Sequence, residues 1–314
     1  MLVSVTLNPC VDHALFVEKL TIGDTNRVMR VEKDAGGKGI NVSRVFAELG
    51  GDTAATGFLG GATASYIRHV LQVEGVEDAF VNIQGETRTN FSVEDDSGTP
   101  PTTLNSRGPN ITEKEWNQLL TDCKDLARGA RWAALGGSLP PGVPDEAFQI
   151  LGELFHAAGL RVILDADGIA QRHGMLAQPD FVKPNAAEAS RLLKTKIESD
   201  LEAVEAVLNL HANLGGGNKI AVISRGKDGA VMATGGGVWV GRAPKVHSTS
   251  TIGSGDSMIA GILWAIDTGK SPADALRWGL ASGAATAMTD GSGIARLPMI
   301  QDLYDESSIE SKLA

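Results

Sequence analysis

Cysteine and positive charge are both scarce in this chain. Of its 314 residues only Cys10 and Cys123 are cysteines, too few and too far apart in sequence for a disulfide framework or a cysteine-rich zinc site. Lys and Arg number 28 against 38 Asp and Glu, so the formal net charge is -10. We therefore expect two reduced thiols and no nucleic-acid-binding surface.

Long apolar runs and repeats are missing as well. No segment has the apolar length needed to cross a bilayer, and the first residues, MLVSVTLNPCVD, carry no basic lead before an apolar run. No solenoid-length repeat and no low-complexity linker divides the chain. These absences predict a cytoplasmic protein with no membrane segment, folded as a single domain over residues 1–314.

Two nucleotide-binding templates are incomplete. A P-loop ending at residues 268–271 would need its first glycine at Trp264, and neither 36–42 nor 253–258 completes a dinucleotide-binding G-x-G-x-x-G. A dinucleotide-dependent dehydrogenase is therefore disfavoured. The six histidines show no metal-ligand spacing.

What the sequence does contain is an alternation of short apolar strands with amphipathic helices. Strands are predicted at 2–7, 132–135, 161–167, 180–185 and 219–226, and helices at 145–158, 186–193, 199–214 and 256–268. Because such alternation is typical of right-handed βαβ units, we expect an α/β fold with a mostly parallel sheet covered by helices on both faces.

Two stretches, 12–34 and 85–107, interrupt this alternation. Their residues alternate around turn signals such as 96–98 with no helix between them, which predicts antiparallel strand pairs. We expect the two excursions to form a small β-sheet lid.

A glycine-rich turn, TIGSGDSMIAG at 251–261, begins the last predicted helix. Gly253 and Gly255 allow successive N–H groups to point into one concavity at a helix N-terminus, which suits an anion, and Asp256 falls in the first turn. The plainer interpretation is an acidic residue that stabilises the helix dipole by ~0.5 kcal/mol. The turn alone favours the plainer interpretation.

Two further motifs begin helices. Asn185 and Glu188 have the spacing of a capping box, and their oxygens also suit Mg2+ completed by water. In GGKGINVSR, residues 36–44, Asn41 lies in the first helical turns and can donate to or accept from a sugar hydroxyl group. A tight strand-to-helix turn explains the same glycines about equally well.

Together with other segments, these motifs resemble the ribokinase-like (pfkB-type) carbohydrate kinases. Nine motifs, NPCVD, AGGKGINVSR, GFLGG, GETRTN, GGSLPPGVP, DADG, VKPNAAEA, SRGKDGA and STIGSGDSMIAG, follow the family's order and spacing from residue 3 to about residue 300. The resemblance is to the phosphosugar branch: 1-phosphofructokinase, tagatose-6-phosphate kinase and the minor type of 6-phosphofructokinase. It implies a ribokinase-like three-layer α/β/α core with a mostly parallel sheet, plus a small β-sheet lid.

The resemblance also implies roles for the matching residues. Asp256 corresponds to the catalytic base, and the amides of Gly253, Ser254 and Gly255 to the anion hole. Positions that hold the phosphosugar are Asp12, Arg27, Gly37, Lys38, Asn41, Arg88 and Ser138, with the two arginines on its phosphate or, alternatively, solvated strand charges. Nucleotide-binding positions are Lys183, Asn185, Ser224, Gly226, Gly229, Ser248 and Thr251, while Asn185 and Glu188 would hold Mg2+ through water.

The activity implied is phosphorylation of a hexose phosphate by ATP with Mg2+, and a monovalent cation such as K+ is a further implied cofactor near residues 290–293. Fructose 1-phosphate is the preferred substrate, and tagatose 6-phosphate and fructose 6-phosphate are alternatives. A nucleoside or plain-sugar kinase is less favoured because Arg88 is present, and a non-catalytic relative is less favoured because Asp256 is present.

Subunit assembly and the phosphate donor are further questions. Strand edges and the apolar residues Phe91, Val93 and Leu104 predict a homodimer joined through the lid. Arg225 and Lys227 stand where relatives usually carry Leu and Ala, so the preference for the phosphate donor stays open.

Overall fold

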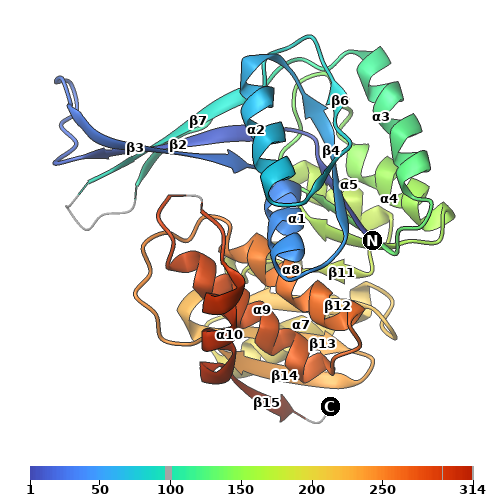
Figure 1. The fold of residues 1–314 in the computed structure, drawn as a ribbon. Helices are drawn as coiled ribbons and strands as arrows, with labels where there is room; N and C mark the ends of the chain where they lie inside the picture. The colour runs from blue at the N-terminus through green and yellow to red at the C-terminus, as the bar shows by residue number, and fades with distance from the viewer. Residues whose placement is uncertain (96–100, 292, 313–314) are drawn as a thin grey trace.

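The fold has two parts, a large sheet covered by helices and a small sheet that projects from it (Figure 1). The computed structural model describes residues 1–95, 101–291 and 293–312. The predicted turn at 96–98 and Ser292 of the predicted cation loop lie outside these ranges. Within them, no helix combines the length and the apolar character that a bilayer crossing requires.

The large sheet is mostly parallel. Its strand order is β15-β14-β13-β12-β11-β10-β9-β1-β4-β5, and β6 also pairs with β4. The parallel strands are β1 (Leu2–Thr6), β4 (Thr53–Leu59), β5 (Glu77–Asp78), β6 (Val81–Asn82), β9 (Trp132–Gly136), β10 (Arg161–Asp165), β11 (Phe181–Val182) and β12 (Ile220–Ser224). An antiparallel edge follows, made of β13 (Ala230–Thr234), β14 (Gly237–Arg242) and β15 (Ser308–Lys312).

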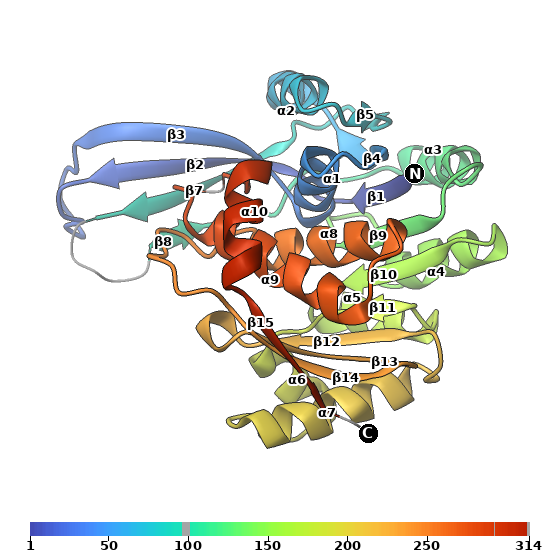
Figure 2. The same ribbon diagram turned by 60° about the horizontal axis from the view of Figure 1, so that its bottom comes forward.

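Helices cover both faces of this sheet (Figure 2). One face carries α1 (Lys38–Glu48), α8 (Ser254–Asp267) and α9 (Pro272–Ala287), with α10 (Leu297–Glu306) packed on α9. The other carries α3 (Glu113–Leu126), α4 (Ala147–Ala157), α5 (Gly168–Leu176), α6 (Ala186–Leu193) and α7 (Asp200–Asn213). Every residue of β1, β4 and β9 is buried because helices lie on both sides, so the predicted α/β architecture is confirmed.

The small sheet contains the two predicted excursions. Its order is β3-β2-β7-β8, with β2 (Cys10–Val17), β3 (Val28–Gly36), β7 (Arg88–Glu94) and β8 (Thr102–Leu104). Each excursion is an antiparallel pair, as the sequence predicted, and parallel pairing of β2 with β7 joins the two. α2 (Gly61–Val73) contacts the root of this sheet, which otherwise extends away from the helices (Figures 1 and 2).

Local sequence signals explain several element boundaries. α6 and α7 begin with capping boxes, Asn185 with Glu188 and Ser199 with Glu202, and both helices begin where the sequence predicted them. The strand predicted at 180–185 is shorter, because β11 ends at Val182, before Pro184, which has no N–H to donate to a neighbouring strand.

Candidate active site

Many of the predicted site residues lie along one edge of the large sheet, where its parallel strands end. The register places Thr6 of β1 beside Gly136 of β9, and Gly136 beside Asp165 of β10. The small sheet starts at the same edge, since β2 follows closely after β1 in the chain. In open α/β sheets, the carboxyl ends of the strands are where ligands bind.

The N-terminus of α8 lies at this edge and leaves amide groups free. Gly253 caps the helix with φ 75°, a left-handed conformation that residues with a side chain rarely adopt. The Ser254 amide donates to the Thr251 carbonyl oxygen at 3.4 Å, whereas the amides of Gly253, Gly255 and Asp256 meet no acceptor among the described residues. Free N–H groups at the positive end of a helix can bind an anion.

Asp256 lies in the first turn of α8 and is 6% exposed. Asn41 Nδ2 donates to its Oδ2 at 2.9 Å, and Lys38 Nζ lies 3.8 Å from its Oδ1. Burial raises the pKa of Asp256 above its ordinary value; Lys38 opposes this shift and the nearby Asp165 carboxylate adds to it. A buried carboxylate with a raised pKa is suited to accept a proton.

Asp256 belongs to a cluster of four charged side chains at the N-terminus of α8. Lys38 Nζ donates to Asp165 Oδ2 at 2.8 Å, and Lys183 is buried nearby, with its Nζ 3.0 Å from where a Cβ on Gly255 would lie. Burial would raise the pKa of Asp165, but Lys183 and Lys38 outweigh it and lower that pKa. Burial would lower the pKa of Lys38, but Asp165 and Asp256 outweigh it and raise that pKa. The cluster therefore pairs two ammonium groups with two carboxyl groups.

The root of the small sheet holds Asp12 in a fixed orientation. Asn90 Nδ2 and Cys10 Sγ both donate to Asp12 Oδ1, at 3.0 and 3.1 Å. Gly36 lies so close that a Cβ there would be 2.1 Å from Asp12 Oδ2. Gly37, the N-cap of α1, follows directly and leads to Lys38. The predicted sugar-binding residues Asp12, Gly37 and Lys38 are thus brought together by the close approach of Gly36, at the end of β3, to Asp12 in β2.

Arg88 lies at the start of β7, opposite Cys10 in β2. Its Nε and Nη2 donate to the Asn8 carbonyl oxygen at 3.2 and 2.9 Å, and its Nη1 donates to the Ser106 carbonyl oxygen at 2.7 Å. Two of its five N–H groups remain for a ligand. Asn8 also donates through Nδ2 to Ser138 Oγ at 3.1 Å, so two predicted substrate residues meet at Asn8.

Arg27 lies far from this place. It precedes Val28, which pairs with Val17 at the other end of β2, whereas Arg88 pairs at Cys10. Seven strand residues at ~3.3 Å each separate the two positions by ~23 Å. Within one chain, the structure does not bring Arg27 and Arg88 together, and the sequence could not show this because the register was unknown.

The predicted nucleotide residues gather at the neighbouring strand ends. Asn185 and Ser224 form a parallel bridge, and Ser224 leads into a turn with Gly226 and Gly229, both at positive φ. The exposed Ser248 and Thr251 belong to the segment between β14 and α8.

Asn185 and Glu188 form the capping box of α6. Asn185 Oδ1 accepts from the Glu188 amide at 2.9 Å, and Glu188 Oε2 accepts from the Asn185 amide at 2.8 Å. Among the described residues, no three His, Cys, Asp or Glu side chains are grouped to hold a metal ion. The second Glu188 oxygen is left over, which fits Mg2+ held through water and completed by substrate phosphates.

The sequence profile of the pfkB family carbohydrate kinases matches residues 5–298 of this chain. The protein belongs to this family. It is 33% identical over 309 residues to the 1-phosphofructokinase of Bacillus subtilis. The matched region covers 98% of this chain and 99% of that protein. This relationship confirms the resemblance that the nine motifs indicated.

Solved structures agree with the family assignment. One is a possible 1-phosphofructokinase from Thermotoga maritima, 26% identical, with a TM-score of 0.86 and 99% of each chain covered. Another is phosphofructokinase-2 from Escherichia coli in complex with potassium, 27% identical, with a TM-score of 0.87 over 97% of this chain and 98% of that one. The ribokinase-like fold expected from the sequence is confirmed.

Three residues of this pfkB kinase site escaped the sequence analysis. Asp165 binds Lys38, Asn90 binds Asp12, and Asn8 joins Arg88 to Ser138. A polar residue at the carboxyl end of a buried strand was a usable signal for both Asp165 and Asn8, because Asp165 is the last residue of β10 and Asn8 lies two residues after β1. Asn90 had no such signal, because its partner depends on the parallel pairing of β2 with β7.

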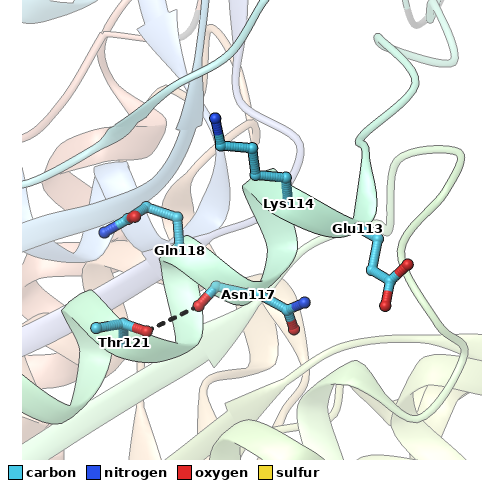
Figure 3. A pocket seen from close by; sticks show the side chains of 5 residues that line it. All are labelled: Glu113, Lys114, Asn117, Gln118 and Thr121. Atoms are coloured by element: carbon cyan, nitrogen blue, oxygen red, sulfur yellow. Dashed lines mark hydrogen bonds between the residues drawn. The ribbon is translucent and has the colours of Figure 1, made fainter.

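A separate surface hollow lies on α3 (Figure 3). It is lined by Glu113, Lys114, Asn117, Gln118 and Thr121, all from successive turns of that helix. The Thr121 hydroxyl donates to the Asn117 carbonyl oxygen at 3.0 Å, within the helix itself. All five lining residues belong to α3, so the hollow is part of the surface of that helix.

Proposed function

We propose that this pfkB kinase transfers a phosphoryl group from ATP to a hexose phosphate, and that fructose 1-phosphate is its substrate. The observation that carries the proposal is Asp256, a buried carboxyl group with a raised pKa beside the free amides of α8. A base next to anion-binding amides suits phosphoryl transfer, which depends on positioning and charge stabilisation. The relative named 1-phosphofructokinase supports this choice of sugar.

In the proposed reaction, the sugar hydroxyl oxygen attacks the γ-phosphorus of ATP and gives its proton to the Asp256 carboxylate. The bond from that phosphorus to the β–γ bridging oxygen breaks, and ADP leaves. The amides of Gly253, Gly255 and Asp256 would stabilise charge on the transferring group, while Asn41 keeps the Asp256 carboxylate oriented.

The other predicted site residues have supporting roles in the proposal. Asp12, Gly37 and Lys38 bind the sugar, and Arg88 and Ser138 bind its phosphate. Lys183, Ser224 and the glycines that follow Ser224 line the nucleotide side. Mg2+, when bound through Asn185 and Glu188, would offset charge on the nucleotide phosphates. The potassium complex of a relative supports K+ as a second ion.

ADP release tests this proposal directly. Purified protein is assayed with ATP and fructose 1-phosphate, tagatose 6-phosphate, fructose 6-phosphate or fructose. We expect the highest kcat/KM with fructose 1-phosphate. A preference for either 6-phosphate would reassign the substrate within the phosphosugar class, and equal activity on fructose would contradict that class.

A further inference from the structure

We propose that Arg107 is a second phosphate-binding arginine of this site and that Asn8 is the residue that positions it. The inference rests on the proposed phosphosugar activity and adds a specificity-determining residue to it. It starts from the balance of charge at the root of the small sheet.

A sugar phosphate carries up to two negative charges, and the site adds another at Asp12. Lys38 is already paired with Asp165 and lies 3.8 Å from Asp256. Arg27 of the same chain is ~23 Å away along the small sheet. Arg88 would therefore face a dianion with little help from these cations, and a second cation near it would balance the charge.

Arg107 is a candidate for this second cation because its segment is held next to Arg88. Asn8 Nδ2 donates to the Arg107 carbonyl oxygen at 3.0 Å, and Arg88 Nη1 donates to the carbonyl oxygen of the preceding residue, Ser106, at 2.7 Å. The Arg107 side chain is exposed and forms no hydrogen bond or ion pair with any described residue. The fold thus holds the backbone of Arg107 next to that of Arg88's partner Ser106, and the Arg107 side chain has no partner there among the described residues.

Asn8 explains why this segment is held so closely. It is 5% exposed, and its Nδ2 donates to both Arg107 and Ser138, while its carbonyl oxygen accepts from Arg88. Gly108 has φ 92°, and a Cβ there would lie 2.2 Å from Asn8 Oδ1. One buried residue therefore connects β7 through its main-chain carbonyl, and the segments after β8 and β9 through its side-chain amide.

The first test is Arg107→Ala, assayed with the best hexose phosphate of the panel. Losing a charge-assisted hydrogen bond to phosphate should raise the KM for that sugar ~10- to 100-fold. The KM for ATP and the activity on fructose should change little, and Arg107→Lys should restore part of the loss, since a point charge lacks the planar fork. Arg128→Ala, an exposed arginine that follows α3, is the matched control and should behave as wild type.

The second test concerns Asn8. Asn8→Ala should raise the same KM, and the double variant Asn8→Ala/Arg107→Ala should be less impaired than the two single effects combined, because part of the Asn8 effect acts through Arg107. Fully additive effects, or an equal rise in the KM for ATP, would make Asn8 merely structural. If Asn8→Ala does not fold, the Arg107 variants still decide.

The outcomes separate this inference from the proposed function. A wild-type protein that phosphorylates no hexose phosphate would overturn the function itself. An active wild type whose Arg107→Ala variant keeps its KM, or loses activity equally on fructose and the hexose phosphate, would overturn the role of Arg107 and leave the function standing.

Discussion

At the scale of single residues, the proposed chemistry depends most on Asp256. Asp256→Asn preserves the shape of the side chain, but an amide cannot take up the proton of the sugar hydroxyl. We expect kcat to fall by ~10^2 or more while KM stays within a few fold. Steady-state kinetics with the best hexose phosphate measures both, and turnover near the wild-type value would exclude Asp256 as the base.

The neighbours of Asp256 predict a pH dependence. Because the pKa of Asp256 is raised, the carboxylate becomes protonated and kcat should decline as the pH falls through that pKa. Asp165→Asn removes a negative charge that raises this pKa and releases Lys38 from its 2.8 Å pairing. Both changes lower the pKa of Asp256, so the acid limb of the kcat profile should move to lower pH. A limb that stays in place would show that Asp165 does not influence the base.

At the scale of elements, Glu188 at the start of α6 has two roles that can be tested separately: it caps the helix, and it is proposed to bind Mg2+. Glu188→Gln keeps the capping box, because Gln can also accept from the N-cap amide. Its melting temperature should therefore stay close to wild type, while the Mg2+ concentration for half-maximal activity should rise ~10-fold. Glu202→Gln, in the equivalent capping box of α7, is the matched control.

Two outcomes would contradict these roles. An unchanged Mg2+ requirement in Glu188→Gln would leave Glu188 as a cap only. Full wild-type activity in excess chelator would remove the metal altogether.

Strand β7 carries a second prediction through Arg88. Arg88→Ala should lower kcat/KM for the hexose phosphate by ~10^2 or more and leave the slow ATP hydrolysis with water nearly unchanged, because only the sugar phosphate needs the guanidinium group. Lysine should restore activity in part. An equal loss on fructose would mean that Arg88 serves only to hold Asn8 and Ser106.

Element boundaries followed from the sequence where local chemistry sets them. α6 was predicted at its observed bounds because Asn185 and Glu188 satisfy the first amides of the helix within a few residues. The short edge strand β15 and the two-residue β5 were not predicted, because they depend on pairing with distant strands rather than on their own pattern.

The site residues also divide into those set by local sequence and those set by contacts between distant segments. Asp256 and its glycines belong to one turn of sequence, but that turn alone favoured a helix-dipole role, and the resemblance of nine motifs was needed to predict a base. The pairing of Lys38 with Asp165 joins segments from α1 and β10, and the distance from Arg27 to Arg88 depends on strand register. Such contacts come from the tertiary fold, which no local pattern encodes.

At the scale of the whole molecule, the small sheet predicts self-association. Leu104 is 59% exposed and Met29 64% exposed, although both belong to sheet strands. Exposed apolar side chains on a sheet with open edges are a surface that a second copy can cover. We expect a homodimer joined through this sheet, measured by light scattering at micromolar concentration.

A charged substitution makes this prediction specific. Leu104→Asp should shift the mass toward that of a monomer, whereas Leu201→Asp, an exposed leucine of α7 that is 68% exposed, should not. A wild-type monomer at micromolar concentration would count against the dimer.

The position of β1 has a consequence for biosynthesis. This strand is synthesised before both of its neighbours in the sheet, β4 and β9, and its partner residues in β9 begin only at Trp132. At ~5–20 residues per second, the first strand waits on the order of ten seconds with one apolar edge unpaired. The central sheet therefore cannot be completed until translation has passed β9.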